Sequence, residues 1–303
     1  MAKVNIQELL DNGVHFGHLT RKWNPNMAPY IYTERNGVHI IDLYKTVAKI
    51  EETSDALQKI ANSGRKILFV ATKKQAKDIV AEKAKAVNMP FITERWPGGM
   101  LTNFITIRKA VKKMATIDRM KQDGSFDALS KREKLQINRQ REKLEKNLGS
   151  ISDMTRLPGA LFVVDIKKEH IAVAEAQKLN IPIFAMVDTN SDPRLVDFVI
   201  PANDDASKSI EKVLSHVTDA IAEGLSNRKA DKEKTKEAPK AEAKEVKTEV
   251  EEVKTEVTEA TEAPKAEAKK APKAKVKEVK EVKAKKKPKV KEAKTDTPSE
   301  ETK

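Results

Sequence analysis

The chain contains no cysteine, and residues 227–303 contain no glycine and no aromatic residue. Without cysteine, a protein can form no disulfide, no thiolate metal site and no thiol nucleophile. No apolar run approaches the roughly 18 residues that span a bilayer, and the N-terminus leads directly into a polar segment. We therefore expect neither a membrane span nor a signal peptide, no membrane partner, and a soluble protein in the cytoplasm.

The segment 227–303 also lacks leucine and isoleucine and consists mainly of Lys, Glu, Ala, Val, Thr and Pro. Such a tail cannot bury enough apolar surface to offset a backbone entropy cost of about 1–2 kcal/mol per residue, so we expect it to be disordered. Residues 239–262 carry 4 Lys and 8 Glu, whereas residues 263–294 carry 14 Lys and 4 Glu. Composition leaves two interpretations open: a salt-sensitive contact with RNA phosphates, and a solvated tail without a partner.

The first 226 residues are enough for one large domain with its own core. Near-continuous apolar runs, which are typical of strands buried on both faces of a parallel sheet, occur at 66–71, 90–92, 160–164, 183–187 and 198–200. Helical stretches are expected at about 74–88, 168–180 and 206–225. This alternation predicts an α/β fold with a doubly wound parallel sheet and right-handed crossovers.

The sequence of the N-terminal region predicts a short helix, a loop, a β-hairpin and a long helix. A short helix is expected at 5–12 and a loop at 13–25. The Asn36-Gly37 pair lies between two β-type runs and suits the positive φ angles of a tight hairpin turn. Asp42 occupies an N-cap position, and the apolar residues after it predict a long helix that ends at Gly64.

Residues 103–150 carry all of the positive excess before the tail. They contain 13 Lys and Arg against 6 Asp and Glu, whereas residues 1–102 and 151–226 together contain 22 of each sign. Apolar residues at helical spacing predict two helices with a break near Gly124. The two helices can pack against each other as an antiparallel coiled coil. A solvated helix face would mix both signs, so the imbalance favours an arm that binds a polyanion.

The sequence lacks the motifs of a nucleotide-using enzyme. The segment Thr72–Ala76, which follows the first expected core strand, contains no glycine that would let the backbone approach a pyrophosphate. The Gly98-Gly99 pair lacks the Lys-Ser/Thr of a P-loop, and no GxGxxG or GxSxG occurs. We expect no enzymatic activity and no small-molecule substrate. A metal-dependent hydrolytic α/β protein is the alternative from a different class.

RNA contacts are expected from the arm, from the 13–27 loop with Trp23, and from the joint between body and arm. The candidate residues are His15, His18, Arg21, Lys22, Trp23, Arg95, Arg108, Lys109, Lys112, Lys113, Arg132 and Arg139. Local packing and turn hydrogen bonds are an open alternative for the two histidines. For the segment that contains Arg95, the alternative is a structural role at the root of the arm.

Three carboxylates follow expected core strands. Asp188 follows one strand, and Asp204 and Asp205 follow the next, so all three should meet at the carboxyl edge of the sheet. With His18 as a nitrogen ligand, this set could hold one Zn²⁺ or Mg²⁺ ion, although the fold requires no cofactor. The alternative is that Asp188 caps a turn and that Asp204 and Asp205 cap the last helix.

Several long runs, in order along residues 1–226, resemble the family of bacterial small-subunit ribosomal protein two. They are GVHFGHLTRKWNPNM at 13–27, NGVHIIDL at 36–43, RWPGGMLTNF at 95–104, LPGALFVVD at 157–165, IPIFAMVDTNSDP at 181–193 and IPANDDA at 200–206.

The resemblance implies a structural constituent of the small ribosomal subunit, located on the ribosome in the cytoplasm. It implies a flavodoxin-like α/β body, formed by 1–102 and 151–226, and a coiled-coil protrusion at 103–150. Its implied partners are small-subunit rRNA and other small-subunit proteins, including the multi-domain mRNA-binding first protein, which it helps to dock. A metal near His18, Asp188, Asp204 and Asp205 is implied for some members. The tail at 227–303 is not covered by the resemblance.

Overall fold

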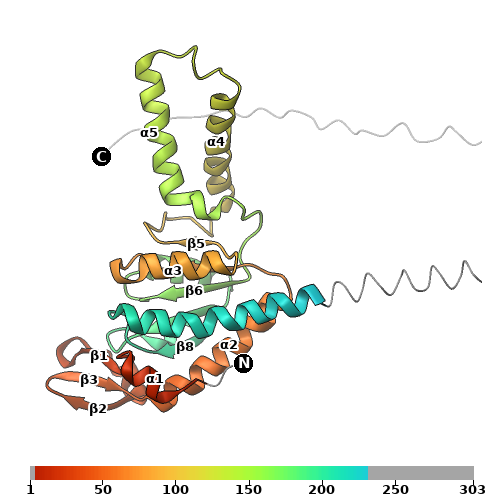
Figure 1. Cartoon of the computed structure of the whole chain (residues 1–303). Coiled ribbons are helices and arrows are strands. Elements are labelled where there is room, and N and C mark those ends of the chain that lie inside the picture. The colour runs from red at the N-terminus through yellow and green to blue at the C-terminus, as the bar shows by residue number, and fades with distance from the viewer. Residues whose placement is uncertain (1–3, 231–303) are drawn as a thin grey trace, which may run out of the picture. The chain divides into compact units, whose positions relative to one another are not determined.

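The computed structural model describes residues 4–230 (Figure 1). The tail expected to be disordered therefore lies, apart from its first four residues, outside the described part of the chain. Among the described residues, no helix is long and apolar enough to cross a membrane.

Five parallel strands form the central sheet: β4 (Ile67–Val70), β5 (Phe91–Ile92), β6 (Ala160–Val164), β7 (Ile183–Val187) and β8 (Phe198–Pro201). Their order across the sheet is β5-β4-β6-β7-β8, and each neighbouring pair is parallel. Counted along the chain this order is 2-1-3-4-5, which is the order of flavodoxin-like sheets. The predicted α/β fold and all five predicted core strands are confirmed.

Both faces of this sheet are buried. On one face, Phe69, Phe162 and Phe184 pack in a core with α2 (Leu43–Asn62), α3 (Lys74–Ala86) and the helical residues 207–230. On the other face, alternating strand residues such as Leu68 and Leu161 pack with α6 (His170–Lys178), Trp96 and the base of the arm. A strand covered on both sides reads as an unbroken apolar run, because neither set of side chains meets water.

A smaller antiparallel sheet lies at the N-terminal end, after α1 (Ile6–Asp11). Its strands are β1 (Phe16–Leu19), β2 (Ile31–Arg35) and β3 (Val38–Ile41), in the order β1-β3-β2. The predicted hairpin is confirmed, with Asn36 and Gly37 at φ values of 52° and 73°.

The expected loop at 13–25 is only partly a loop. It contains β1 and the 3₁₀ turn η1 (Thr20–Lys22), and η2 (Pro25–Tyr30) begins at its end. Strand β1 has a glycine and a histidine in its centre and no alternation of apolar residues. Its extended form comes from pairing with β3, which a local sequence pattern does not reveal.

The arm consists of α4 (Phe104–Gln122) and α5 (Lys131–Leu148), which run side by side (Figure 1). Gly124 has a φ of +72° in the connection, where the break was predicted. Ser130 starts α5 with a capping box that it forms with Glu133. The 3₁₀ turn η3 (Gly149–Ile151) returns the chain to the body, and Leu148 is buried in the second core together with Ile151.

Candidate metal centre and nucleic-acid interface

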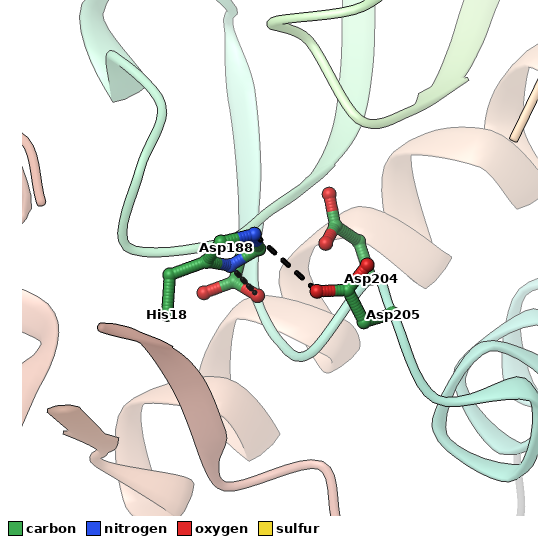
Figure 2. A group of neighbouring side chains, drawn as sticks. All are labelled: His18, Asp188, Asp204 and Asp205. Atoms are coloured by element: carbon green, nitrogen blue, oxygen red, sulfur yellow. Dashed lines mark ion pairs between the residues drawn. The ribbon is translucent and has the colours of Figure 1, made fainter. Parts of the chain in front are cut away.

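A cluster of acidic side chains and one histidine lies at the carboxyl edge of the central sheet (Figure 2). Asp188 follows β7, and Asp204 and Asp205 follow β8. His18 comes from β1 and reaches the same place. One ligand atom from each of the four residues lies within 4.8 Å of the others. The structure therefore brings together the four residues that the sequence proposed as metal ligands.

The segment after β7 holds His18 in this position. The backbone N–H of His18 donates to Oγ1 of Thr189 at 2.9 Å. Gly17 makes this approach possible, because a Cβ at that position would lie 2.7 Å from the Thr189 methyl carbon. The hydroxyl of Thr189 in turn donates to Oδ1 of Asp188 at 3.1 Å. The second oxygen of Asp188 is thus left to face His18.

Three buried atoms of the cluster have no hydrogen-bond partner: His18 Nδ1, Asp188 Oδ2 and Asp204 Oδ2. The first two are 2.8 Å apart, which allows an ion pair when His18 is protonated, but they lack the alignment of a hydrogen bond. The adjacent Asp188 carboxylate nevertheless raises the pKa of His18, against the opposing effect of burial. Buried acceptors without donors are costly, so this donor set suits a cation.

Lys73, directly before α3, also contacts the cluster. Its Nζ is 2.8 Å from Oδ1 of Asp204 and 2.6 Å from Oδ1 of Asp205. Oδ2 of Asp165, which follows β6, is 3.8 Å away. Burial and the neighbouring carboxylates of Asp188 and Asp165 raise the pKa of Asp204 to about 7, despite the lysine.

The alternative role of Asp204 and Asp205 as helix caps is wrong. The Oδ1 atoms of both aspartates face the Lys73 ammonium instead. The turn before the helical residues 207–230 is held by Asn203, whose Oδ1 accepts from the backbone N–H groups of Asp205 and Ala206 at 2.9 and 3.3 Å. The alternative for Asp188 holds in part, because its Oδ1 accepts from its neighbour Thr189 and its backbone carbonyl accepts from Ser191. Its Oδ2 still has no hydrogen-bond donor.

Six cations proposed on the arm are exposed: Arg108, Lys109, Lys112, Lys113, Arg132 and Arg139. Within residues 4–230, none of the six forms an ion pair. Arg141, by contrast, is turned inward: it pairs with Asp118 of the facing helix and with Glu145. Exposed cations without a carboxylate partner are the feature that binding to a polyanion needs.

The N-terminal candidates divide into two groups. Arg21, Lys22 and Trp23 are exposed, and Trp23 lies against the ring of His39 with 5.2 Å between ring centroids. His15 is partly buried against Phe16, and burial lowers its pKa, which favours the neutral ring. His18 belongs to the acidic cluster. The two histidines therefore make local contacts, whereas Arg21, Lys22 and Trp23 are exposed.

The joint between body and arm is held by one carboxylate. Glu175 of α6 is buried, and its Oε1 accepts from Trp96 Nε1 at 3.1 Å and from the Gly99 N–H at 2.8 Å. Its Oε2 accepts from the N–H groups of Leu101 and Thr102 at 2.9 and 3.1 Å, and from the Thr102 hydroxyl at 3.2 Å. The structural role expected as an alternative for this segment is thus observed. Arg95 remains exposed and lines a cavity of about 750 Å³ with Lys143 and Lys168.

Comparison with known proteins agrees with this architecture. The family described as ribosomal protein S2 matches residues 9–224, which include the sheet, the arm and the acidic cluster. The chain belongs to the ribosomal protein S2 family. Relatives named small ribosomal subunit protein uS2 occur in Flavobacterium johnsoniae, 76% identical over 80% of this chain and 96% of the relative, and in Christiangramia forsetii, 73% identical over 80% and 81%. The relative of that name in Bacteroides thetaiotaomicron is 65% identical over 82% of this chain and 91% of its own length.

Three functional residues of this S2-family chain were missed from the sequence: Lys73, Asp165 and Glu175. The first two stand where Asp188 does, just beyond the end of a core strand, so the rule that gathers strand ends at one edge could have found them. The role of Glu175 could not be predicted, because a helical sequence pattern does not show which buried N–H groups a glutamate on that helix will contact.

Replacement of Glu175 by Gln should destabilise the protein. The NH₂ group of the glutamine would face N–H donors where a carboxylate oxygen now accepts from them, so some of these donors would lose their acceptor. This should lower the free energy of unfolding by about 2–3 kcal/mol. Chemical denaturation measures the change, with the exposed Glu82→Gln as the matched control.

Burial opposes ionisation of Glu175, but the donors from Thr102, Leu101, Trp96 and Gly99 outweigh it and lower its pKa. The ionised Glu175 therefore stabilises the folded protein at pH values above about 4.3, the pKa of glutamate in the unfolded chain. As the pH falls below that value, the free energies of unfolding of the wild type and of Glu175→Gln should become more similar.

Proposed function

We propose that this chain is a structural, non-catalytic constituent of the small ribosomal subunit that binds small-subunit rRNA through its arm. The observation that carries the proposal is the set of exposed arm cations without carboxylate partners, on a body whose charges balance. The names of the relatives support the same assignment. On this proposal the protein acts on the ribosome in the cytoplasm.

The arm would act as an antiparallel coiled coil that carries charge to the RNA. Apolar residues such as Ile107, Ile117 and Leu144 lie toward the facing helix or the core, while Lys112 and Arg139 face solvent. Each lysine or arginine that neutralises a phosphate releases condensed counterions, so binding should weaken steeply with salt. Arg21, Lys22, Trp23 and Arg95 would add contacts from the body, with Trp23 as a stacking surface.

The body would serve as a rigid platform for neighbouring proteins. Its sheet is buried on both faces, and Glu175 fixes the root of the arm to α6. A rigid joint transmits the position of the arm on RNA to the rest of the surface. In line with the family resemblance, the partners would include the multi-domain mRNA-binding protein of the subunit.

The acidic cluster fits a bound cation, and we propose one Zn²⁺ or Mg²⁺ ion there. His18, Asp188, Asp204 and Asp205 would hold it, because they offer one nitrogen and several oxygens, including buried atoms without hydrogen-bond donors. Such an ion would supply positive charge that links the N-terminal sheet to the ends of β7 and β8, and its role would be structural.

Reversing two arm charges should weaken assembly. We expect Lys112→Glu with Lys113→Glu to reduce the fraction of the chain that sediments with small subunits at least tenfold at physiological salt, because it removes two phosphate contacts and adds repulsion. Sucrose-gradient fractionation of cells that express a tagged chain measures this fraction. The control is Lys178→Glu with Lys208→Glu, an identical charge change at exposed positions of the body. Equal incorporation of both variants would rule out the arm as an RNA contact.

Removing one metal ligand should weaken metal binding. The full chain, dialysed against zinc and then against buffer, should retain about one equivalent, and Asp188→Asn should lower the affinity at least tenfold. Elemental analysis of the dialysed protein gives the stoichiometry. Asp78→Asn, which alters an exposed carboxylate of α3, is the matched control. A wild-type protein that retains no zinc or magnesium contradicts the proposed site.

A further inference from the structure

Lys73 divides the acidic cluster into two lobes. In the first lobe, His18 lies 2.8 Å from Oδ2 of Asp188 and 3.3 Å from Oδ2 of Asp205. In the second, the Lys73 ammonium lies 2.8 Å from Oδ1 of Asp204 and 2.6 Å from Oδ1 of Asp205. Asp165 contacts only the second lobe, at 3.8 Å from the ammonium.

The two central carboxylates bridge the lobes. Asp205 directs Oδ1 to Lys73 and Oδ2 to His18. Asp204 directs Oδ1 to Lys73, and its buried Oδ2 has no hydrogen-bond partner. Carboxylates that offer one oxygen to each of two cations are typical of sites with two metal ions about 3.5–4 Å apart. In this protein one of the two cation positions is filled by a side chain.

We propose that the Lys73 ammonium takes the place of a second metal ion in what would otherwise be a binuclear carboxylate centre. The inference rests on the proposed metal site and explains why that site would take one ion. Lys73 is only 13% exposed and lies directly before α3, three residues after the end of β4, so its ammonium is held in the second lobe. An ion in the first lobe and the lysine in the second would share the charge of Asp204 and Asp205.

The charge of the cluster favours a cation in each lobe. Four carboxylates meet there, from Asp165, Asp188, Asp204 and Asp205, and Asp204 is fully buried. A buried carboxylate that loses its cation retains its desolvation cost without compensation. Without the lysine, Asp165 and the Oδ1 atoms of Asp204 and Asp205 would form a second oxygen site, which hard divalent ions prefer.

The experiment counts metal ions in the full chain with and without the lysine. Equilibrium dialysis against zinc, with elemental analysis, should give one equivalent for the wild type and two for Lys73→Ala. Lys74→Ala, at an exposed neighbouring position, is the matched control and should stay at one. Lys73→Ala combined with Asp165→Asn should return to one, because it removes a ligand of the second lobe only.

Thermal unfolding is the second readout. In chelator, Lys73→Ala should unfold at a lower temperature than the wild type, and zinc should raise its melting temperature more than it raises that of the wild type. If Lys73→Ala does not fold in chelator, recovery of folding on addition of zinc supports the proposal, and failure to recover overturns it.

The outcomes separate the two proposals. One equivalent with unchanged affinity in both Lys73→Ala and the wild type overturns the role of Lys73 and leaves the metal site intact. No zinc in the wild type but bound zinc in Lys73→Ala supports the lysine as a substitute cation and refutes a metal in the natural protein. No zinc in either protein overturns both.

Discussion

The burial of the parallel sheet on both faces determines where this protein can place charge. Strands covered by apolar layers leave polar side chains only at their ends, and parallel strands bring all their carboxyl ends to one edge. Lys73, Asp165, Asp188 and Asp204 each stand just beyond such an end. The acidic cluster is thus a product of topology, since these residues are distant in sequence and close only when the sheet has formed.

Hydrogen bonds at the joint with the body fix the direction of the arm. Its two helices are rich in cations and contribute few buried side chains of their own, so their direction is set mainly where they join the core. There a single buried carboxylate accepts five hydrogen bonds from the segment that leads into α4. A charged acceptor for clustered N–H groups is stronger than a neutral one, which makes the joint stiff.

Much of this architecture could be predicted from local signals. The apolar runs predicted the core strands, Asn36-Gly37 predicted the hairpin, and the lopsided charge marked the arm. What failed depends on long-range contacts: β1 becomes a strand because β3 pairs with it. Asp204 and Asp205, which were also considered as helix caps, direct their carboxylates to the distant Lys73 instead. The four proposed ligands did converge, and for the three aspartates the prediction used strand topology. Lys73 was considered only as part of a phosphate loop, and its partners lie on strands far along the chain.

The position of His18 in the chain has a consequence for the order of events during synthesis. This residue emerges from the ribosome early, but the carboxylates that surround it follow β7 and β8, after both arm helices. The N-terminal sheet must therefore wait for nearly the whole body before its histidine finds its neighbours, and until then only β3 holds β1. Synthesis of β8 and of the two aspartates that follow it is thus the step that allows His18 to reach all its neighbours.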